Sequence, residues 1–197
     1  GPVLDLGCGS GFVSRIAAGL GVSRCAMDIS PRILAAIPDP SLSRVAGDSD
    51  LLPFRSESFS AVVAFAVLHH LHSYDCLVSE VYRVLRPGGI FYTDHDMDRL
   101  FFRLFRAPLA LYRVMTGAKT RRQLAKIKAS AKSNELSEFQ HEGIPTSEIL
   151  SGLYRAGFQS VSSDFHWYGL SSITDRCFGT RAFSSGWAPL SRIVARK

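Results

Sequence analysis

A glycine-rich loop directly after an apolar strand constrains this chain more than any other feature. Residues 3–6 have the apolar character of a short strand, and glycines follow at positions 7, 9 and 11. Glycine lets the backbone turn sharply and approach a ligand closely, because it has no Cβ. Helix-forming residues follow at positions 12–18. The order of strand, glycine loop and helix is typical of α/β folds that bind nucleotides.

The spacing of these glycines narrows the class of ligand. A dinucleotide-binding loop would place its third glycine at position 12, where this chain has Phe12. A phosphate-binding P-loop ends in Gly-Lys-Ser or Gly-Lys-Thr, and the chain has no such ending here. Asp5 would repel a pyrophosphate but suits a ligand that carries positive charge. S-adenosylmethionine fits this requirement, since it has a sulfonium, an ammonium and no phosphate.

Four segments in a fixed order resemble the class I S-adenosylmethionine-dependent methyltransferases. They are VLDLGCGSG at 3–11, GDSDLLPF at 47–54, VLHHL at 67–71 and LRPGG at 85–89. One departure is Phe59-Ser60, where the family usually has Phe-Asp. The resemblance covers roughly the first half of the chain. It implies an α/β fold with a doubly wound, Rossmann-like, seven-stranded sheet, and S-adenosylmethionine as the cofactor.

The resemblance also implies a cofactor site. Asp28 stands 17 residues after Gly11 (28 − 11), near the interval at which a carboxylate meets a ribose in such folds; it also suits capping of the helix that begins at Ser30-Pro31. Asp48 would accept the adenine amino group, although an Asx turn also accounts for it. The predicted cofactor-binding residues are Asp5, Gly7, Cys8, Gly9, Gly11, Asp28, Ile29, Asp48, Ser49 and Phe65.

Methyl transfer mainly requires alignment of the acceptor, the methyl group and the sulfur, with a base where the acceptor must lose a proton. The predicted catalytic residues are His69, His70 and Asp94, because they follow strands whose carboxyl ends face the ligand in open α/β sheets. One of the two adjacent histidines is expected to pack or cap a helix instead, and His95 and Asp96 are alternatives. We predict no metal site, because the magnesium-binding carboxylates of catechol-type relatives are not recognisable.

The positive charge of the chain is concentrated in one segment. Residues 99–132 hold ten Lys and Arg and no acidic residue, whereas the rest of the chain holds 13 basic and 17 acidic residues. The spacing of Arg99, Arg103, Arg106 and Arg113 would align them on one helix face. We rank four roles for that face. A lid whose arginines face water comes first, and a lid over an apolar or acidic substrate comes second. Contact with an anionic membrane comes third and binding of nucleic acid last.

These patterns predict a single domain, 1–197, in three parts. Residues 1–97 form the cofactor-binding core, 98–144 a helical cap inserted after the fifth strand, and 145–197 a helix with Thr146 as N-cap followed by an antiparallel strand hairpin. Four cysteines without a CxxC pair fit a reducing, cytoplasmic location. The chain begins inside the first strand without a Met, and the resemblance implies a preceding segment over the active site.

The predicted function is methyl transfer from S-adenosylmethionine to a small, hydrophobic, lipid-like molecule, with peripheral membrane contact as a further expectation. One alternative is an RNA or protein methyltransferase that docks through the basic segment at 99–132. Another is a subunit that binds the cofactor without turnover. The residues indicate no particular oligomeric state.

Overall fold

The computed structural model describes residues 1–107 and 143–197, which build a seven-stranded sheet with helices on both faces. The α/β prediction is therefore confirmed. In chain order the described elements are β1 (Val3–Leu6), α1 (Phe12–Gly19), β2 (Arg24–Asp28), α2 (Pro31–Ala36), β3 (Ser43–Ala46), β4 (Phe59–Phe65), η1 (Leu68–His70), α3 (Asp75–Val84), β5 (Leu85–Met97), α4 (Arg99–Leu104), α6 (Thr146–Ala156), β6 (Ser160–His166), α7 (Ser172–Phe178) and β7 (Leu190–Arg196).

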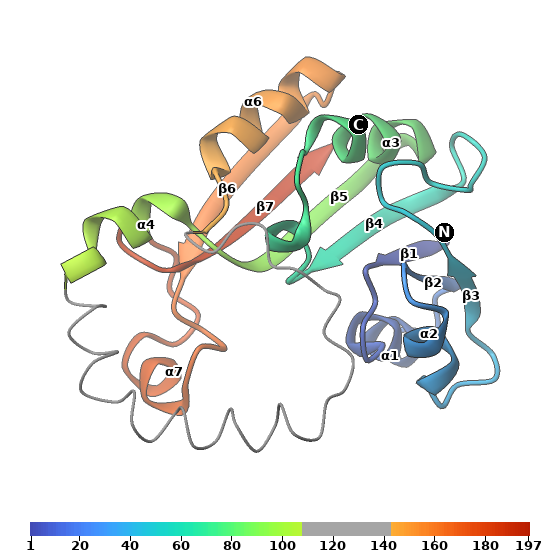
Figure 1. The fold of residues 1–197 in the computed structure, drawn as a ribbon, viewed down its shortest axis with the longest axis horizontal. Helices are drawn as coiled ribbons and strands as arrows, with labels where there is room; N and C mark the ends of the chain where they lie inside the picture. Colours follow the sequence, from blue (N-terminus) through green and yellow to red (C-terminus); the bar gives the residue numbers. More distant parts are fainter. Residues whose placement is uncertain (108–142) are drawn as a thin grey trace.

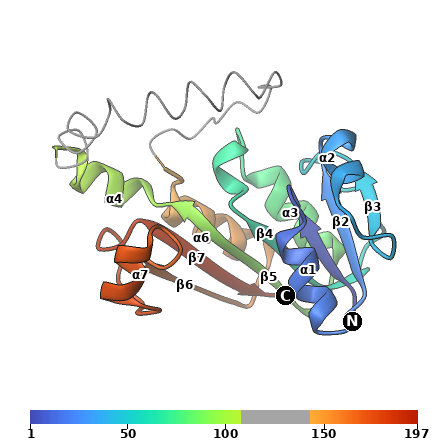
Figure 2. The same cartoon turned by 90° about the horizontal axis from the view of Figure 1, so that it is seen from below.

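The sheet is doubly wound, as predicted. Its strand order is β3-β2-β1-β4-β5-β7-β6, with β1 to β5 parallel and β7 antiparallel to both of its neighbours. The chain runs outward from β1 to β3 and then returns to β4, with α1 and α2 on one face and α3 and α6 on the other (Figures 1 and 2). A crevice is expected where this order reverses, beyond the carboxyl ends of β1 and β4.

The central strands carry the core. Leu4, Val62 and Phe91, from β1, β4 and β5, have no exposed surface. Strand β4 ends at Phe65, although the apolar run of the sequence continues to Leu68. Ala66 adopts a positive φ of 56° while its N–H donates to the Asp94 carbonyl oxygen at 2.8 Å. This turn directs the chain into η1, which carries both predicted histidines.

Strand β5 is 13 residues long and contains a bulge. The preceding helix ends at Val84, before Pro87, and β5 continues to Met97. The register against β7 shifts between Thr93 and Asp96, and His95 lies there at a positive φ of 67°. Bulges of this kind redirect side chains and are frequent beside functional sites.

Only the beginning and end of the predicted cap at 98–144 fall in the described part of the chain. Helix α4 is present but ends at Leu104; Arg113 and the rest of 108–142 lie outside the described residues. Arg99 does not share a solvated face with Arg103, since its Nε donates to the Gly143 carbonyl oxygen at 3.3 Å. In the two described ranges, no helix has the length and apolar character needed to cross a membrane.

Asp98, only 2% exposed, ties the end of β5 to two helices. Its carboxylate accepts hydrogen bonds from the Phe101 N–H at 3.2 Å, the Thr146 hydroxyl at 2.8 Å and the Ser185 hydroxyl at 3.4 Å. Thr146 is therefore not the N-cap of α6, a position that Pro145 occupies. Instead, Thr146 is the first helical residue and anchors the helix to Asp98.

We expect Asp98→Ala to lower the free energy of unfolding by about 2–4 kcal/mol, because it removes a helix cap and leaves a buried hydroxyl unpaired. Urea unfolding followed by circular dichroism measures this change. Asp98→Asn keeps an acceptor oxygen and should lose less. Equal stabilities of Asp98→Ala and the parent chain would contradict the anchoring role.

Candidate cofactor-binding site

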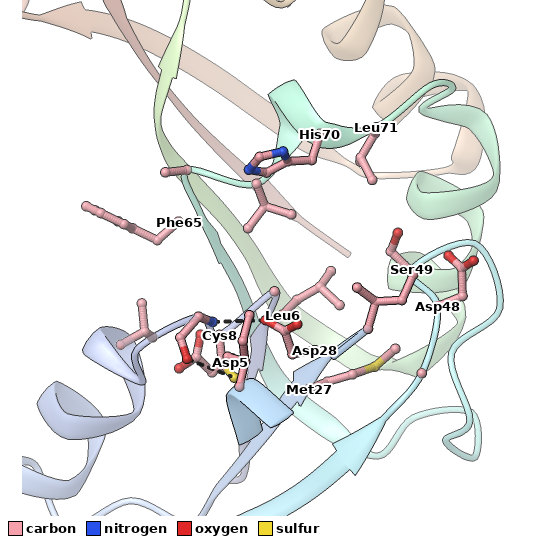
Figure 3. A pocket seen from close by; sticks show the side chains of 18 of the residues that line it. Asp5, Leu6, Cys8, Met27, Asp28, Asp48, Ser49, Phe65, His70 and Leu71 are labelled. Carbon is pink, nitrogen blue, oxygen red and sulfur yellow. Dashed lines mark hydrogen bonds between the residues drawn. The ribbon is translucent and has the colours of Figure 1, made fainter. Parts of the chain in front are cut away.

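A cavity of about 590 Å³ opens at the carboxyl ends of β1, β2 and β4, where the strand order reverses (Figure 3). Nearly all of the predicted cofactor residues line it, and Gly11 does not. Those in the lining are Asp5, Gly7, Cys8, Gly9, Asp28, Ile29, Asp48, Ser49 and Phe65. His70 lines the cavity as well, whereas His69 and Asp94 do not.

Glycine stands at the three loop positions for different physical reasons. All have positive φ, at 64° for Gly7, 48° for Gly9 and 74° for Gly11. A Cβ on Gly7 would lie 2.7 Å from Val67, and one on Gly11 would lie 3.1 Å from Ile37, so both are required by packing. A Cβ on Gly9 would meet nothing within 4 Å. Gly9 therefore leaves open space at the cavity wall for a ligand to approach the backbone.

Asp5 stabilises the junction between the glycine loop and α1. Its Oδ2 accepts the backbone N–H of Ser14 at 2.8 Å and the Ser14 hydroxyl at 2.6 Å. This carboxylate thus caps α1 from β1, because the N-cap residue of that helix is Gly11, which has no side chain. Burial raises the pKa of Asp5 despite these hydrogen bonds, and the nearby charge of Asp28 acts in the same direction.

Cys8 is a structural thiol in this environment. Burial, together with the charges of Asp5 and Asp28, raises its pKa to about 12. Because the thiolate is the reactive form of cysteine, Cys8 is not a nucleophile at neutral pH. Its contribution is to the wall of the cavity.

Asp28 joins the glycine loop to the start of α2. Its Oδ2 accepts the Gly9 N–H at 3.1 Å, and its Oδ1 accepts the Ser30 N–H at 2.9 Å. It does not cap α2, since the Ser30 hydroxyl does so by accepting the Ile33 N–H at 3.4 Å. The carboxylate is 8% exposed and lines the cavity, so further lone pairs can accept hydroxyl groups there.

Asp48 forms the Asx turn that the sequence also allowed. Its Oδ1 accepts the Asp50 N–H at 3.0 Å, while the side chain remains exposed at the cavity. The turn and a ligand role are therefore compatible. Ser49, next to it, also faces the cavity in Figure 3.

An ion pair on α3 holds the loop after Asp48, and sequence reasoning missed it. Glu80 Oε2 accepts the Leu52 N–H at 2.8 Å, and Arg83 donates to the Leu52 and Phe54 carbonyl oxygens at 2.9 and 2.7 Å. Hydrogen bonding from Arg83 lowers the pKa of Glu80. The spacing of three residues on a helix, just before LRPGG, was the available signal.

The cavity lining carries negative charge. Among the described residues it holds the carboxylates of Asp5, Asp28, Asp48 and Asp50, and neither lysine nor arginine. Carboxylates concentrated in a cleft attract cations and repel anions. A pyrophosphate does not fit this lining, whereas a ligand with a sulfonium and an ammonium does.

The adjacent histidines differ in their surroundings. The backbone N–H of His69 and its Nδ1 lie 3.0 and 2.8 Å from Asp96 Oδ1, and Asp96 has no exposed surface. The His70 ring lies 4.0 Å from that of His69, measured between centroids, and projects over the cavity in Figure 3. The structure thus separates a histidine at the cavity from a neighbour held by a buried carboxylate.

Asp94 is turned away from the cavity and toward two other histidines. Its Oδ1 lies 2.7 Å from His166 Nε2 and 3.0 Å from His95 Nδ1, and its Oδ2 accepts the Tyr92 hydroxyl at 2.6 Å. Burial raises the pKa of Asp94, but the hydrogen bonds from His166, His95 and Tyr92 outweigh it, so the net pKa is lowered. Asp94 is therefore a carboxylate that is ionised at neutral pH.

Comparisons with known proteins agree with this geometry. Residues 4–93 match the family model described as a methyltransferase domain. An uncharacterized methyltransferase of Synechocystis is 36% identical over 126 residues, which cover 62% of this chain and 59% of that protein. A demethylmenaquinone methyltransferase of Corynebacterium glutamicum is 38% identical over 87 residues, covering 44% of this chain and 38% of that protein.

The fold has matches among solved structures. An S-adenosylmethionine-dependent methyltransferase of Thermotoga maritima aligns with a TM-score of 0.66 at 18% identity, over 100% of this chain and 82% of that one. The chain thus spans 59% and 38% of the two curated relatives named above, and it shares its fold with the solved structure. The match of residues 4–93 to a methyltransferase domain, the order of the strands in the sheet and the acidic cavity at the switch point agree with one another.

Proposed function

We propose that this protein transfers a methyl group from S-adenosylmethionine to a small, hydrophobic, lipid-like acceptor. The observation that carries the proposal is the cavity lining, which combines four carboxylates with the open backbone at Gly9. A cationic nucleoside fits such a lining better than any phosphate-bearing nucleotide.

Particular residues would hold the cofactor. Asp28 would accept the two ribose hydroxyls, and Asp48 with Ser49 would meet the adenine. Asp5 and the loop at Gly7–Gly9 would face the cationic end, where negative charge favours it. When bound, S-adenosylmethionine supplies a methyl group already activated by its sulfonium.

We assign His70 as the base for an acceptor that must lose a proton. His70 lines the cavity, and a neutral imidazole can take a proton directly from a hydroxyl placed there. His69 would act as a positioning residue, because its hydrogen bonds to buried Asp96 fix η1 in place. Asp94 has no part in this assignment, since it lies outside the cavity lining.

A hydrophobic acceptor agrees with the apolar side chains at the rim of the cavity. Phe12, 46% exposed, lies with its ring 5.1 Å from that of Phe65, and Leu71 also lines the cavity. The Corynebacterium relative is named for a quinone, demethylmenaquinone, which supports an acceptor of that class. Docking on RNA or protein through 99–132 remains an alternative, since most of that segment lies outside the described residues.

Isothermal titration calorimetry tests the cofactor. We expect S-adenosylmethionine and its demethylated product to bind, and NAD not to bind, because its pyrophosphate would face the carboxylates of the lining. A screen for transfer of labelled methyl to cell extract then separates enzyme from non-catalytic subunit. Tight NAD binding would contradict the cofactor; binding without any labelled product would favour the subunit.

A further inference from the structure

A second cluster of ionisable side chains lies outside the cofactor cavity, near the ends of β5 and β6. One ligand atom from each of Asp94, His95 and His166 lies within 4.8 Å of the others, and Asp94 Oδ1 is 3.0 Å from His95 Nδ1 and 2.7 Å from His166 Nε2. Asp94 and His166 are buried, whereas the side chain of His95 is 22% exposed. The cluster is therefore anchored in the protein but accessible from one side.

The hydrogen bond at Nδ1 of His166 determines whether the other ring nitrogen, Nε2, carries a hydrogen or a lone pair. Nδ1 lies 3.1 Å from the Tyr168 carbonyl oxygen, so Nδ1 must carry the hydrogen that this bond requires. In the neutral ring Nε2 then has a lone pair, which faces Asp94 Oδ1 at 2.7 Å. Two acceptors at this distance repel each other unless a cation lies between them. That cation is either a proton or a metal ion.

We propose that Asp94, His95 and His166 bind a divalent transition-metal ion of the zinc type. Two imidazole nitrogens and one carboxylate oxygen are the donor set that such ions prefer, with a fourth position left for water. Ligands at about 2.0–2.2 Å from zinc stand roughly 3.4 Å apart in a tetrahedron. The observed distances from Asp94 Oδ1, 2.7 Å to His166 Nε2 and 3.0 Å to His95 Nδ1, are shorter than this spacing by less than about 1 Å.

Surrounding groups already orient the ligands as metal sites require. The Tyr92 hydroxyl donates to Asp94 Oδ2 and the His95 N–H donates to Asp94 Oδ1, each at 2.6 Å, and the Tyr168 carbonyl directs Nε2 of His166. Such partners beyond the ligands fix tautomer and orientation. The bulge in β5 contributes as well: neighbours in a regular strand point to opposite faces, but here Asp94 and His95 converge.

This site does not depend on the proposed methyl transfer. Asp94, His95 and His166 do not line the cofactor cavity, although the His95 ring lies 4.2 Å, between centroids, from the ring of Phe65, which does. Zinc binding can therefore be measured without cofactor or acceptor, and its failure would leave the cofactor assignment intact.

The experiment titrates the full chain with Zn²⁺ alone, in competition with a chromogenic chelator. The exposed thiols of Cys76 and Cys177 are first replaced by serine, because they could bind zinc adventitiously. We expect one tightly bound ion per chain. Loss of a partner that orients a ligand weakens metal binding by about 10–100-fold, and Tyr92→Phe should have an effect of this size. Asp94→Asn and His95→Gln remove ligands themselves and should weaken zinc binding more.

His72→Gln is the matched control, since it removes an exposed imidazole outside the cluster and should leave the zinc affinity unchanged. His95→Gln is the decisive variant, because His95 is the most exposed ligand and its loss should preserve the far-UV circular dichroism spectrum. Equal affinities of His95→Gln and the parent would overturn the proposal. So would a parent chain without a stoichiometric ion at neutral pH, in which case the cation beside His166 is a proton.

Discussion

Replacing His70 with glutamine should lower kcat by about 10²–10⁴-fold, the usual contribution of a positioned base. The affinity for S-adenosylmethionine should change little, because the lost interaction belongs to the transition state. The rate of the parent should fall toward acid pH, since a protonated imidazole cannot accept a proton, and the variant should lack this dependence. Steady-state rates with the acceptor found in the extract screen, measured across pH, provide the check.

His69→Gln is the matched variant for this prediction. It keeps a side chain of similar size but disturbs the contact with Asp96, so it should reduce kcat less than His70→Gln and leave the acid dependence in place. If both variants keep the parental rate, the transfer proceeds by alignment alone and His70 is not a base. If both lose cofactor binding, the pair serves the structure of η1.

Replacing Asp28 with alanine should weaken S-adenosylmethionine binding by about 1.5–3 kcal/mol, the range for hydrogen bonds to a charged group. The structure adds a second reason for a loss, because Asp28 also accepts the Gly9 N–H at 3.1 Å and so holds the loop. Calorimetry measures the affinity, and urea unfolding shows whether the fold survives.

Ser30→Ala is the matched control for damage at the start of α2. It removes the cap of α2 while the Asp28 carboxylate remains at the cavity, so cofactor affinity should stay near the parental value. Asp28→Asn keeps an oxygen for one hydroxyl and should fall between alanine and parent. An unchanged affinity in Asp28→Ala would contradict a part of Asp28 in cofactor binding, both through the ribose and through the loop.

The first half of the fold was predictable because its signals are local. Glycine spacing, apolar strands and helix stops each occupy a few neighbouring residues, and their order determines the parallel sheet from β1 to β5. Ligand-facing residues follow, since the carboxyl ends of such strands meet at one edge. Even there the bounds were inexact, because the positive φ of Ala66 ends β4 without a glycine to indicate it.

The partners of the carboxylates after β5 were not predictable in this way. Asp94 meets His166, 72 residues further along the chain, and Asp96 meets His69, 27 residues before it. These contacts depend on the register between β5 and β7 and on a bulge that no turn residue in the sequence indicates. The sequence therefore indicated that Asp94 was close to functional chemistry but not that it faces away from the cofactor cavity.

Phe65 lies between the cofactor cavity and the cluster of Asp94, His95 and His166. Its ring lies 5.1 Å from Phe12 on the cofactor side and 4.2 Å from His95 on the other, and His95 in turn lies 5.4 Å from His166. A ligand that shifts the Phe65 ring would therefore also displace the neighbouring rings of Phe12 and His95. Coupling between two binding sites is reciprocal. If a ligand in the cofactor cavity changes the affinity of the cluster for its ion by some factor, the ion changes the affinity of the cavity for that ligand by the same factor.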